Sequence, residues 1–262
     1  MTIVIRNRQG KKLSVEITGP DEAPVVLFSN SLGTDKGMWE PQVNALKADY
    51  RIVTYDARGH GASQIVENAS LENLGADAID ILDGLSIAKA HFCGISMGGL
   101  TGLWLGIHHP DRFHSVTIAN AAARIGVPVA WQERAETVTG HGLAPVVSGT
   151  PARWFSDDFD YKQDALAMRT IQSLADTSPQ GYAAACRALA GADLREQIRQ
   201  IPIPVLIIVG TRDPVTTVAD GQFMQAHIPD SKLSELAASH LSNIEQPAAF
   251  SQELRHFIES LV

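Results

Sequence analysis

The chain has 262 residues, of which 45% are hydrophobic, so it is long enough to bury a substantial core as one domain. Its net charge of −8, without a stripe of Lys and Arg, argues against nucleic-acid binding, because phosphates demand clustered cations. Polar residues interrupt the N-terminus where a signal peptide would need a continuous apolar stretch, and no later stretch is long and apolar enough to span a bilayer. Cys93 and Cys186 fit no disulfide or metal-binding spacing. We therefore expect a cytoplasmic protein with reduced cysteines and no nucleic-acid or membrane partner.

Strands and helices alternate over residues 1–123, which predicts a mostly parallel sheet that begins with an antiparallel hairpin. The expected strands cover residues 2–5, 12–18, 25–28, 51–55, 88–93 and 116–119, and a helix is expected over residues 71–85. The fold class indicated is α/β.

Residues 124–191 lack this strand pattern and instead have helical patterns at 131–139, 164–175 and 181–190, separated by Gly and Pro. We interpret the segment as a helical cap inserted into the α/β core, which resumes over residues 192–262. That second part has strands expected near 205–209 and 232–236 and a closing helix over 247–261.

The pentapeptide Gly94-Ile95-Ser96-Met97-Gly98 follows one of the expected strands and precedes an apolar helical stretch. A G-x-S-x-G sequence in that context is typical of a nucleophile elbow, in which glycines permit a strained turn and the helix N-terminus faces the substrate. Ser96 is therefore the candidate nucleophile.

A serine nucleophile needs a general base and a carboxylate that orients the base, and the order expected in this architecture is Ser, acid, His. Asp213 follows the apolar strand 205–209, and His240 follows the strand 232–236. The sequence has nine histidines, and His240 alone combines the right order with a loop after a strand. Asn120 ends another strand but cannot supply the negative charge. The expected triad is Ser96, Asp213 and His240.

An oxyanion hole requires backbone N–H groups, one from the residue after the nucleophile and one from an early loop. These are the amides of Met97 and Leu32, which follows the strand 25–28. We expect both side chains to line the pocket.

Four segments together resemble those of 3-oxoadipate enol-lactonases of the α/β-hydrolase superfamily. They are Asn30-Ser31-Leu32-Gly33-Thr34-Asp35, Met38-Trp39-Glu40-Pro41-Gln42, the stretch 55–63 (YDARGHGAS) and the stretch 239–247 (SHLSNIEQP). The resemblance spans core and cap, and it implies an α/β-hydrolase fold and hydrolysis of 3-oxoadipate enol-lactone to 3-oxoadipate in aromatic-acid breakdown. In the stretch 55–63 we expect a structural turn in which Asp56 and Arg58 pair with each other.

The substrate that this resemblance implies is a small anionic lactone, whose carboxylate an acidic protein must hold with a local cation. Among the arginines of the cap, Arg134 is preferred because Trp131 lies three residues earlier on the same expected helix, with Trp154 as a second aromatic wall. The other candidates are Arg124, Arg153 and Arg187.

Other functions share this scaffold: a carboxylesterase, a carbon–carbon bond hydrolase, a perhydrolase, or a non-enzymatic small-molecule receptor, against which a complete triad argues. Acyl-enzyme formation and direct attack by water activated by His240 are both compatible with the sequence. No feature indicates a metal or an organic cofactor, and beyond the substrate we expect weak self-association at most.

Overall fold

The computed structural model describes residues 1–261. Its single sheet has the strands β1 (Thr2–Arg6), β2 (Lys12–Thr18), β3 (Val25–Ser29), β4 (Arg51–Tyr55), β5 (Ala90–Ile95), β6 (Phe113–Ala119), β7 (Val205–Gly210) and β8 (Ser231–Leu236). Their order across the sheet is β1-β2-β4-β3-β5-β6-β7-β8, with antiparallel pairing at β1/β2 and β2/β4 and parallel pairing from β4 to β8. This is the expected mostly parallel sheet with an antiparallel hairpin at its start.

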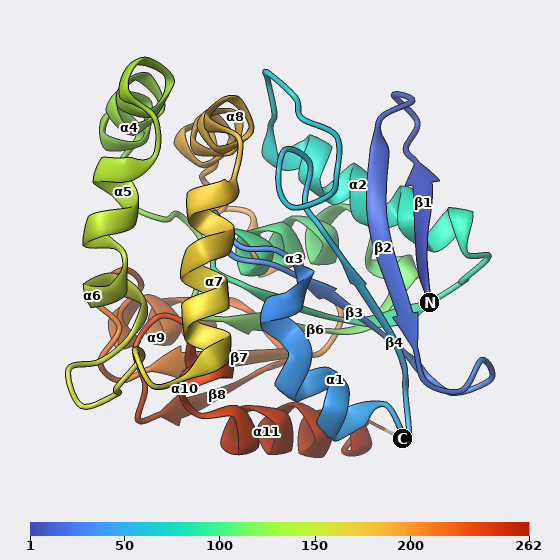
Figure 1. Ribbon diagram of the computed structural model, residues 1–262. Helices are drawn as coiled ribbons and strands as arrows, with labels where there is room; N and C mark the ends of the chain where they lie inside the picture. The colour runs from blue at the N-terminus through green and yellow to red at the C-terminus, as the bar shows by residue number, and fades with distance from the viewer. Residues whose placement is uncertain (262) are drawn as a thin grey trace.

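The helices of the core cover both faces of the sheet. They are η1 (Lys36–Trp39), α1 (Glu40–Leu46), α2 (Leu71–Gly84), α3 (Met97–His108), η2 (Pro110–Arg112), η3 (Ile198–Gln200), α9 (Val218–His227), α10 (Ser242–Glu245) and α11 (Pro247–Glu259). Figure 1 shows α1 and α11 on one face and α2 and α3 on the other. Every residue of β5 and of β7 is buried, because parallel strands covered on both faces have no solvent side.

Between β6 and η3 the regular elements are helices: α4 (Pro128–His141), α5 (Ala144–Gly149), α6 (Pro151–Trp154), α7 (Ala165–Asp176) and α8 (Pro179–Ala190). These helices gather at one side of the sheet (Figure 1). The sequence predicted three of them; α5 and α6 were missed because each is too short to repeat an apolar period. The boundary of a separate cap at residues 124–191 stays a prediction.

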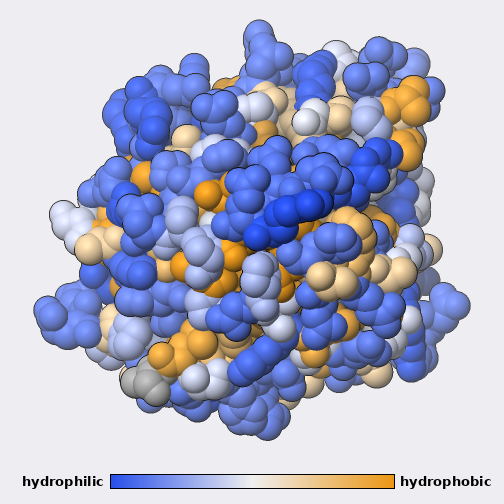
Figure 2. Space-filling view, turned by 180° about the vertical axis from the view of Figure 1, so that it is seen from behind, coloured by the Kyte–Doolittle hydropathy of each residue, from blue (hydrophilic) through white to orange (hydrophobic). Residues whose placement is uncertain are grey.

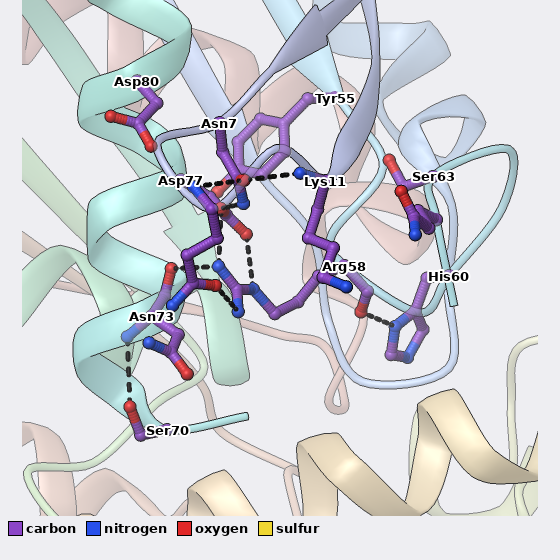
Figure 3. Close-up of polar contacts among 12 residues, drawn as sticks. Asn7, Lys11, Tyr55, Arg58, His60, Ser63, Ser70, Asn73, Asp77 and Asp80 are labelled. Carbon is purple, nitrogen blue, oxygen red and sulfur yellow. Dashed lines mark hydrogen bonds and ion pairs between the residues drawn. The ribbon is translucent and has the colours of Figure 1, made fainter. Parts of the chain in front are cut away.

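The stretch 55–63 forms a buried turn, but our expectation that Asp56 pairs with Arg58 is wrong. Asp56 binds Lys36, whose Nζ lies 2.7 Å from Oδ2. Arg58 makes a two-pronged ion pair with Asp77 of α2, at 2.7 Å from each carboxylate oxygen, and Asn7 donates to the same carboxylate at 2.6 Å (Figure 3). The Asp56 carboxylate also accepts the backbone N–H groups of Lys36 at 2.8 Å and Ala62 at 3.0 Å, so its acceptors are occupied by η1 and the turn, and Arg58 pairs with α2 instead.

The surface seen in Figure 2 is predominantly hydrophilic. Apolar residues on this face lie in small separate groups, as is ordinary for a surface in contact with water. Within residues 1–261, no helix is both long enough and apolar enough to cross a membrane.

Candidate active site

Ser96 lies at the sharp turn between β5 and α3, with φ +56° and ψ −115°. A non-glycine residue with positive φ is strained, and such strain is found at sites that aim a side chain. The flanking glycines make the turn possible, since a Cβ on Gly94 would lie 2.1 Å from the Gly98 carbonyl oxygen and one on Gly98 would lie 2.2 Å from that of Ser29. The sequence thus builds the elbow that its G-x-S-x-G pattern predicted.

Asp213 lies in the loop after β7 and is surrounded by donors. Its Oδ1 accepts the backbone N–H groups of Val215 at 2.7 Å and Thr216 at 3.1 Å, and its Oδ2 accepts the Thr216 hydroxyl at 2.7 Å and the Asn120 amide at 3.0 Å. Burial alone would raise the pKa of Asp213, but the charge of His240 and the hydrogen bonds from His240, Asn120 and Thr216 lower it below its ordinary value. The carboxylate is therefore ionised at neutral pH.

His240 follows β8 and faces that carboxylate, with Nδ1 at 2.8 Å from Asp213 Oδ2. An ionised carboxylate can only accept, so Nδ1 carries the proton and Nε2 is left as the acceptor. This is the tautomer that a general base requires.

Ser96 and His240 line the same cavity, which has a volume of about 190 Å³. A cavity of this size suits a small molecule. The cap helices supply Trp131, Arg134, Arg153, Trp154 and Tyr182 to its wall. The structure therefore places all three sequence-predicted cap residues beside the predicted nucleophile and base.

Of the two predicted oxyanion donors, Met97 follows Ser96 in the elbow and Leu32 lies in the loop after β3. Among residues 1–261, neither the N–H of Leu32 nor that of Met97 has a hydrogen-bond acceptor. The Gly98 N–H donates to the Asn30 carbonyl at 3.0 Å, and the Asn30 side chain is held by Tyr55 and Trp39, so the two loops are fixed relative to each other. Leu32 lines the cavity, but Met97 is not among its lining residues, contrary to expectation; its side chain packs in the hydrophobic core at the start of α3.

The chain matches the family model of the α/β-hydrolase fold over residues 24–247. It is 62% identical to 3-oxoadipate enol-lactonase 1 of Acinetobacter baylyi over 99% of this chain and 98% of that protein, and 47% identical to 3-oxoadipate enol-lactonase 2 of the same organism over 97% and 94%. This chain belongs to the 3-oxoadipate enol-lactonase family of α/β hydrolases. The crystal structure of the enol-lactonase from Burkholderia xenovorans LB400 agrees, with a TM-score of 0.95, 38% identity, and coverage of 98% of this chain and 100% of that one. The predicted fold class and family are confirmed.

In this α/β hydrolase the cap contacts the loop that carries the predicted base. The Trp154 carbonyl accepts the Leu241 N–H at 3.0 Å, and the Arg153 carbonyl accepts the Ser239 hydroxyl at 3.4 Å. Glu245 accepts the Ser239 N–H at 2.9 Å and also binds Ser156 of the cap. Two residues that line the cavity thus hold the His240 loop through their own backbone.

Of the four candidate arginines, the structure brings Arg134 and Arg153 to the cavity. Arg124 instead lies 3.8 Å from Asp193, and Arg187 donates to the Glu67 carbonyl at 3.1 Å. Burial, followed by the nearby charge of Arg134, lowers the pKa of Arg153, which shows that the two guanidinium groups share one environment. Sequence reasoning left the two unresolved because helical periodicity does not report distances between helices.

Sequence reasoning missed Tyr182, and it considered Asn120 only as a possible acid, although Asn120 donates a hydrogen bond to Asp213. Burial raises the pKa of the Tyr182 phenol to about 12, so the cavity has a neutral hydroxyl at any working pH. Nothing in its local sequence distinguishes Tyr182 from a core residue of α8. No group of three or more His, Cys, Asp or Glu side chains in residues 1–261 is arranged to hold a metal ion.

Proposed function

We propose that this protein hydrolyses 3-oxoadipate enol-lactone to 3-oxoadipate, with Ser96 as nucleophile, His240 as base and Asp213 as the acid that orients it. The observation that carries the proposal is one cavity into which Ser96, His240 and an arginine without a carboxylate partner all open. In residues 1–261, Arg134 forms no ion pair, so its charge is available to an anionic substrate. The 62% identity with an enol-lactonase supports the same substrate.

The proposed reaction begins when His240 Nε2 takes the hydroxyl proton of Ser96 and the serine oxygen attacks the lactone carbonyl. The amides of Leu32 and Met97 stabilise the oxyanion that forms. Collapse breaks the ring C–O bond, and the leaving enolate takes the proton from His240. Because an enolate is a better leaving group than an ordinary alkoxide, and because the enol becomes a ketone, ring opening is favoured over reclosure.

In the second half of the proposed reaction, His240 removes a proton from water, which attacks the carbonyl carbon of the acyl-serine ester. The bond to the serine oxygen then breaks, Ser96 takes the proton back from His240, and the second carboxylate of the product is released. Rapid quenching followed by intact-protein mass spectrometry tests this route. An adduct on Ser96 with the mass of the substrate supports it, whereas steady turnover without any adduct would favour direct attack by water.

The substrate is tested by following the loss of enol-lactone absorbance with purified protein, beside neutral p-nitrophenyl esters of similar size. We expect kcat/KM to be far higher on the enol-lactone. A preference for the neutral esters would instead assign the protein to the carboxylesterases.

We further propose that the enzyme acts in the cytoplasm, because Cys93 and Cys186 are free and buried, as is usual for proteins of a reducing compartment. Weak self-association stays a prediction.

A further inference from the structure

Asn120 occupies the junction between the strand that carries the nucleophile and the strand that carries the acid. It follows the last residue of β6, is fully buried, and has φ +41°, a conformation that Asn tolerates better than most residues. The Ala119 carbonyl accepts the Ser96 N–H at 2.9 Å, and the Asn120 N–H donates to the Ile208 carbonyl of β7 at 2.8 Å. The backbone at this point is therefore bound to both neighbours.

The side chain of Asn120 joins the two remaining loops. Its Nδ2 donates to Asp213 Oδ2 at 3.0 Å and to the Ser239 carbonyl at 3.0 Å, and its Oδ1 accepts the Ser242 hydroxyl at 2.5 Å. Both amide hydrogens and the amide oxygen are used, and reversing the amide would set its oxygen against a carboxylate and a carbonyl. The orientation is thus fixed by its partners.

The partners of this one amide lie around the base. Ser239 and Ser242 flank His240 in the sequence, and the Asp213 oxygen that Asn120 contacts is the one that accepts from His240 Nδ1 at 2.8 Å. Asp213, His240 and Glu245 are the charged or titratable groups next to these contacts, while Arg212 turns away to Asp158. A neutral donor is required here because a second carboxylate would repel Asp213.

We propose that Asn120 is a positioning residue, which fixes the Asp213 carboxylate and the His240 loop relative to each other and to the Ser96 elbow. The inference rests on the proposed roles of these three residues and goes beyond them, since Asn120 acts through Asp213 and His240 and is not among the residues that line the cavity.

The test is Asn120→Gly, which keeps positive φ accessible and removes the amide. We expect kcat on the enol-lactone to fall roughly ten- to hundredfold, the effect of losing a hydrogen bond to a charged group, while KM changes little. Loss of a donor to Asp213 makes the Asp213–His240 pair bind a proton more readily, so the low-pH limb of kcat/KM should move to higher pH. A folded Asn120→Gly with wild-type kcat and an unmoved pH profile would overturn the proposal.

The matched control is Asn7→Ala. Asn7 is also a buried amide that donates to an aspartate, Asp77, at 2.6 Å, but it lies in the network of Figure 3 and lines no part of the cavity. Asn7→Ala should lower the midpoint temperature of thermal unfolding without changing kcat or the pH profile of kcat/KM. Equal kinetic losses in both variants would show that lost stability, and not positioning, explains the effect.

Asn120→Asp is the alternative test of the proposal if Asn120→Gly does not fold. It preserves the size of the side chain but replaces two N–H donors with a carboxyl group that has one at most, so a similar fall in kcat is expected. Wild-type kcat in this variant would contradict the proposal.

A readout without the lactone separates this inference from the proposed function. The rate at which a fluorophosphonate labels Ser96, followed by mass spectrometry, reports activation of the serine and should fall in the Asn120 variants. If wild-type protein is labelled but does not open the enol-lactone, the substrate is wrong and the labelling rate still decides the role of Asn120. If wild-type Ser96 is not labelled, both proposals fail.

Discussion

The guanidinium carbon of Arg134 lies 5.0 Å from the ring centre of Trp131, one turn earlier on α4. The aromatic face supports the cation without neutralising it. Both residues line the cavity that contains Ser96 and His240, so the charge can meet a carboxylate on the substrate.

Arg134→Met should therefore lower kcat/KM on the enol-lactone. The loss should correspond to about 1.5–3 kcal/mol of transition-state stabilisation, the usual range for a hydrogen bond to a charged group. A neutral ester of similar size should be affected much less. The comparison of the two substrates by steady-state kinetics is the measurement.

Two further variants locate the carboxylate site. Arg124→Met removes a cap arginine that does not line the cavity and should leave both substrates unchanged. If Arg153→Met, and not Arg134→Met, shows the loss on the anionic substrate, the carboxylate is bound by Arg153.

Ser96→Ala and His240→Ala should each reduce kcat by roughly 10⁴-fold or more, because a triad acts as one unit. For the same reason the double variant should be no worse than either single one. Thermal unfolding checks that the fold survives. Substantial turnover by folded Ser96→Ala would disprove its role as nucleophile.

Asp213→Asn should lower kcat by roughly 10⁴-fold, because an amide favours the wrong tautomer of His240. Steady-state kinetics of the folded variant is the measurement, and full activity would require another carboxylate.

The lowered pKa of Asp213 also predicts how stability depends on pH. A carboxylate with a lower pKa in the folded state stabilises the fold above its ordinary pKa, and that contribution is lost as the pH falls through the lowered value. As the pH is lowered from 6 into the acidic range, the unfolding free energy of the wild type should therefore fall more than that of Asp213→Asn. Urea titrations of both proteins at each pH are the measurement.

Gly181→Ala should disturb the contact between α8 of the cap and the turn at Gly59. A Cβ on Gly181 would lie 2.2 Å from the Gly59 carbonyl oxygen, so the backbones must separate. We expect a loss of about 1–3 kcal/mol in stability and a raised KM. Gly191→Ala is the control, since its Cβ would be 3.8 Å from the nearest atom, and equal effects of the two changes would exclude the contact as the cause.

Arg58→Met should cost about 3–5 kcal/mol of unfolding free energy, because it leaves the Asp77 carboxylate buried without its cation. Removing both charges in Arg58→Met/Asp77→Leu should cost less than the sum of the single changes. The exposed pair of Arg199 and Glu196 is the comparison, and Arg199→Met should cost about 0–1 kcal/mol. Additive losses at Arg58 and Asp77 would mean that the pair is not coupled.

The fold could be predicted from the sequence wherever a pattern is local and long enough. Apolar runs gave β7 nearly residue for residue, and α2 and α7 were expected within about two residues of where they lie. The same reasoning misplaced β5 by two residues, because the elbow glycines look like a turn although the strand continues to Ile95. The very short α5 and α6 offered no period to detect.

The residues of the candidate site also divide into those that the local sequence predicts and those that it does not. Ser96 and its neighbouring amides were predictable because a G-x-S-x-G turn is a local device, and Asp213 and His240 because each loop must follow a particular strand. Other features depend on distances between segments that lie as much as 122 residues apart. They are the positions of Arg134 and Arg153 at one cavity, the ion pairs of Asp56 and Arg58 with other partners, and the three contacts of Asn120. Local sequence determines which backbone a segment adopts, whereas only the packed sheet and cap determine which side chains meet, because hydrogen bonds and ion pairs act over a few ångströms in space and not along the chain.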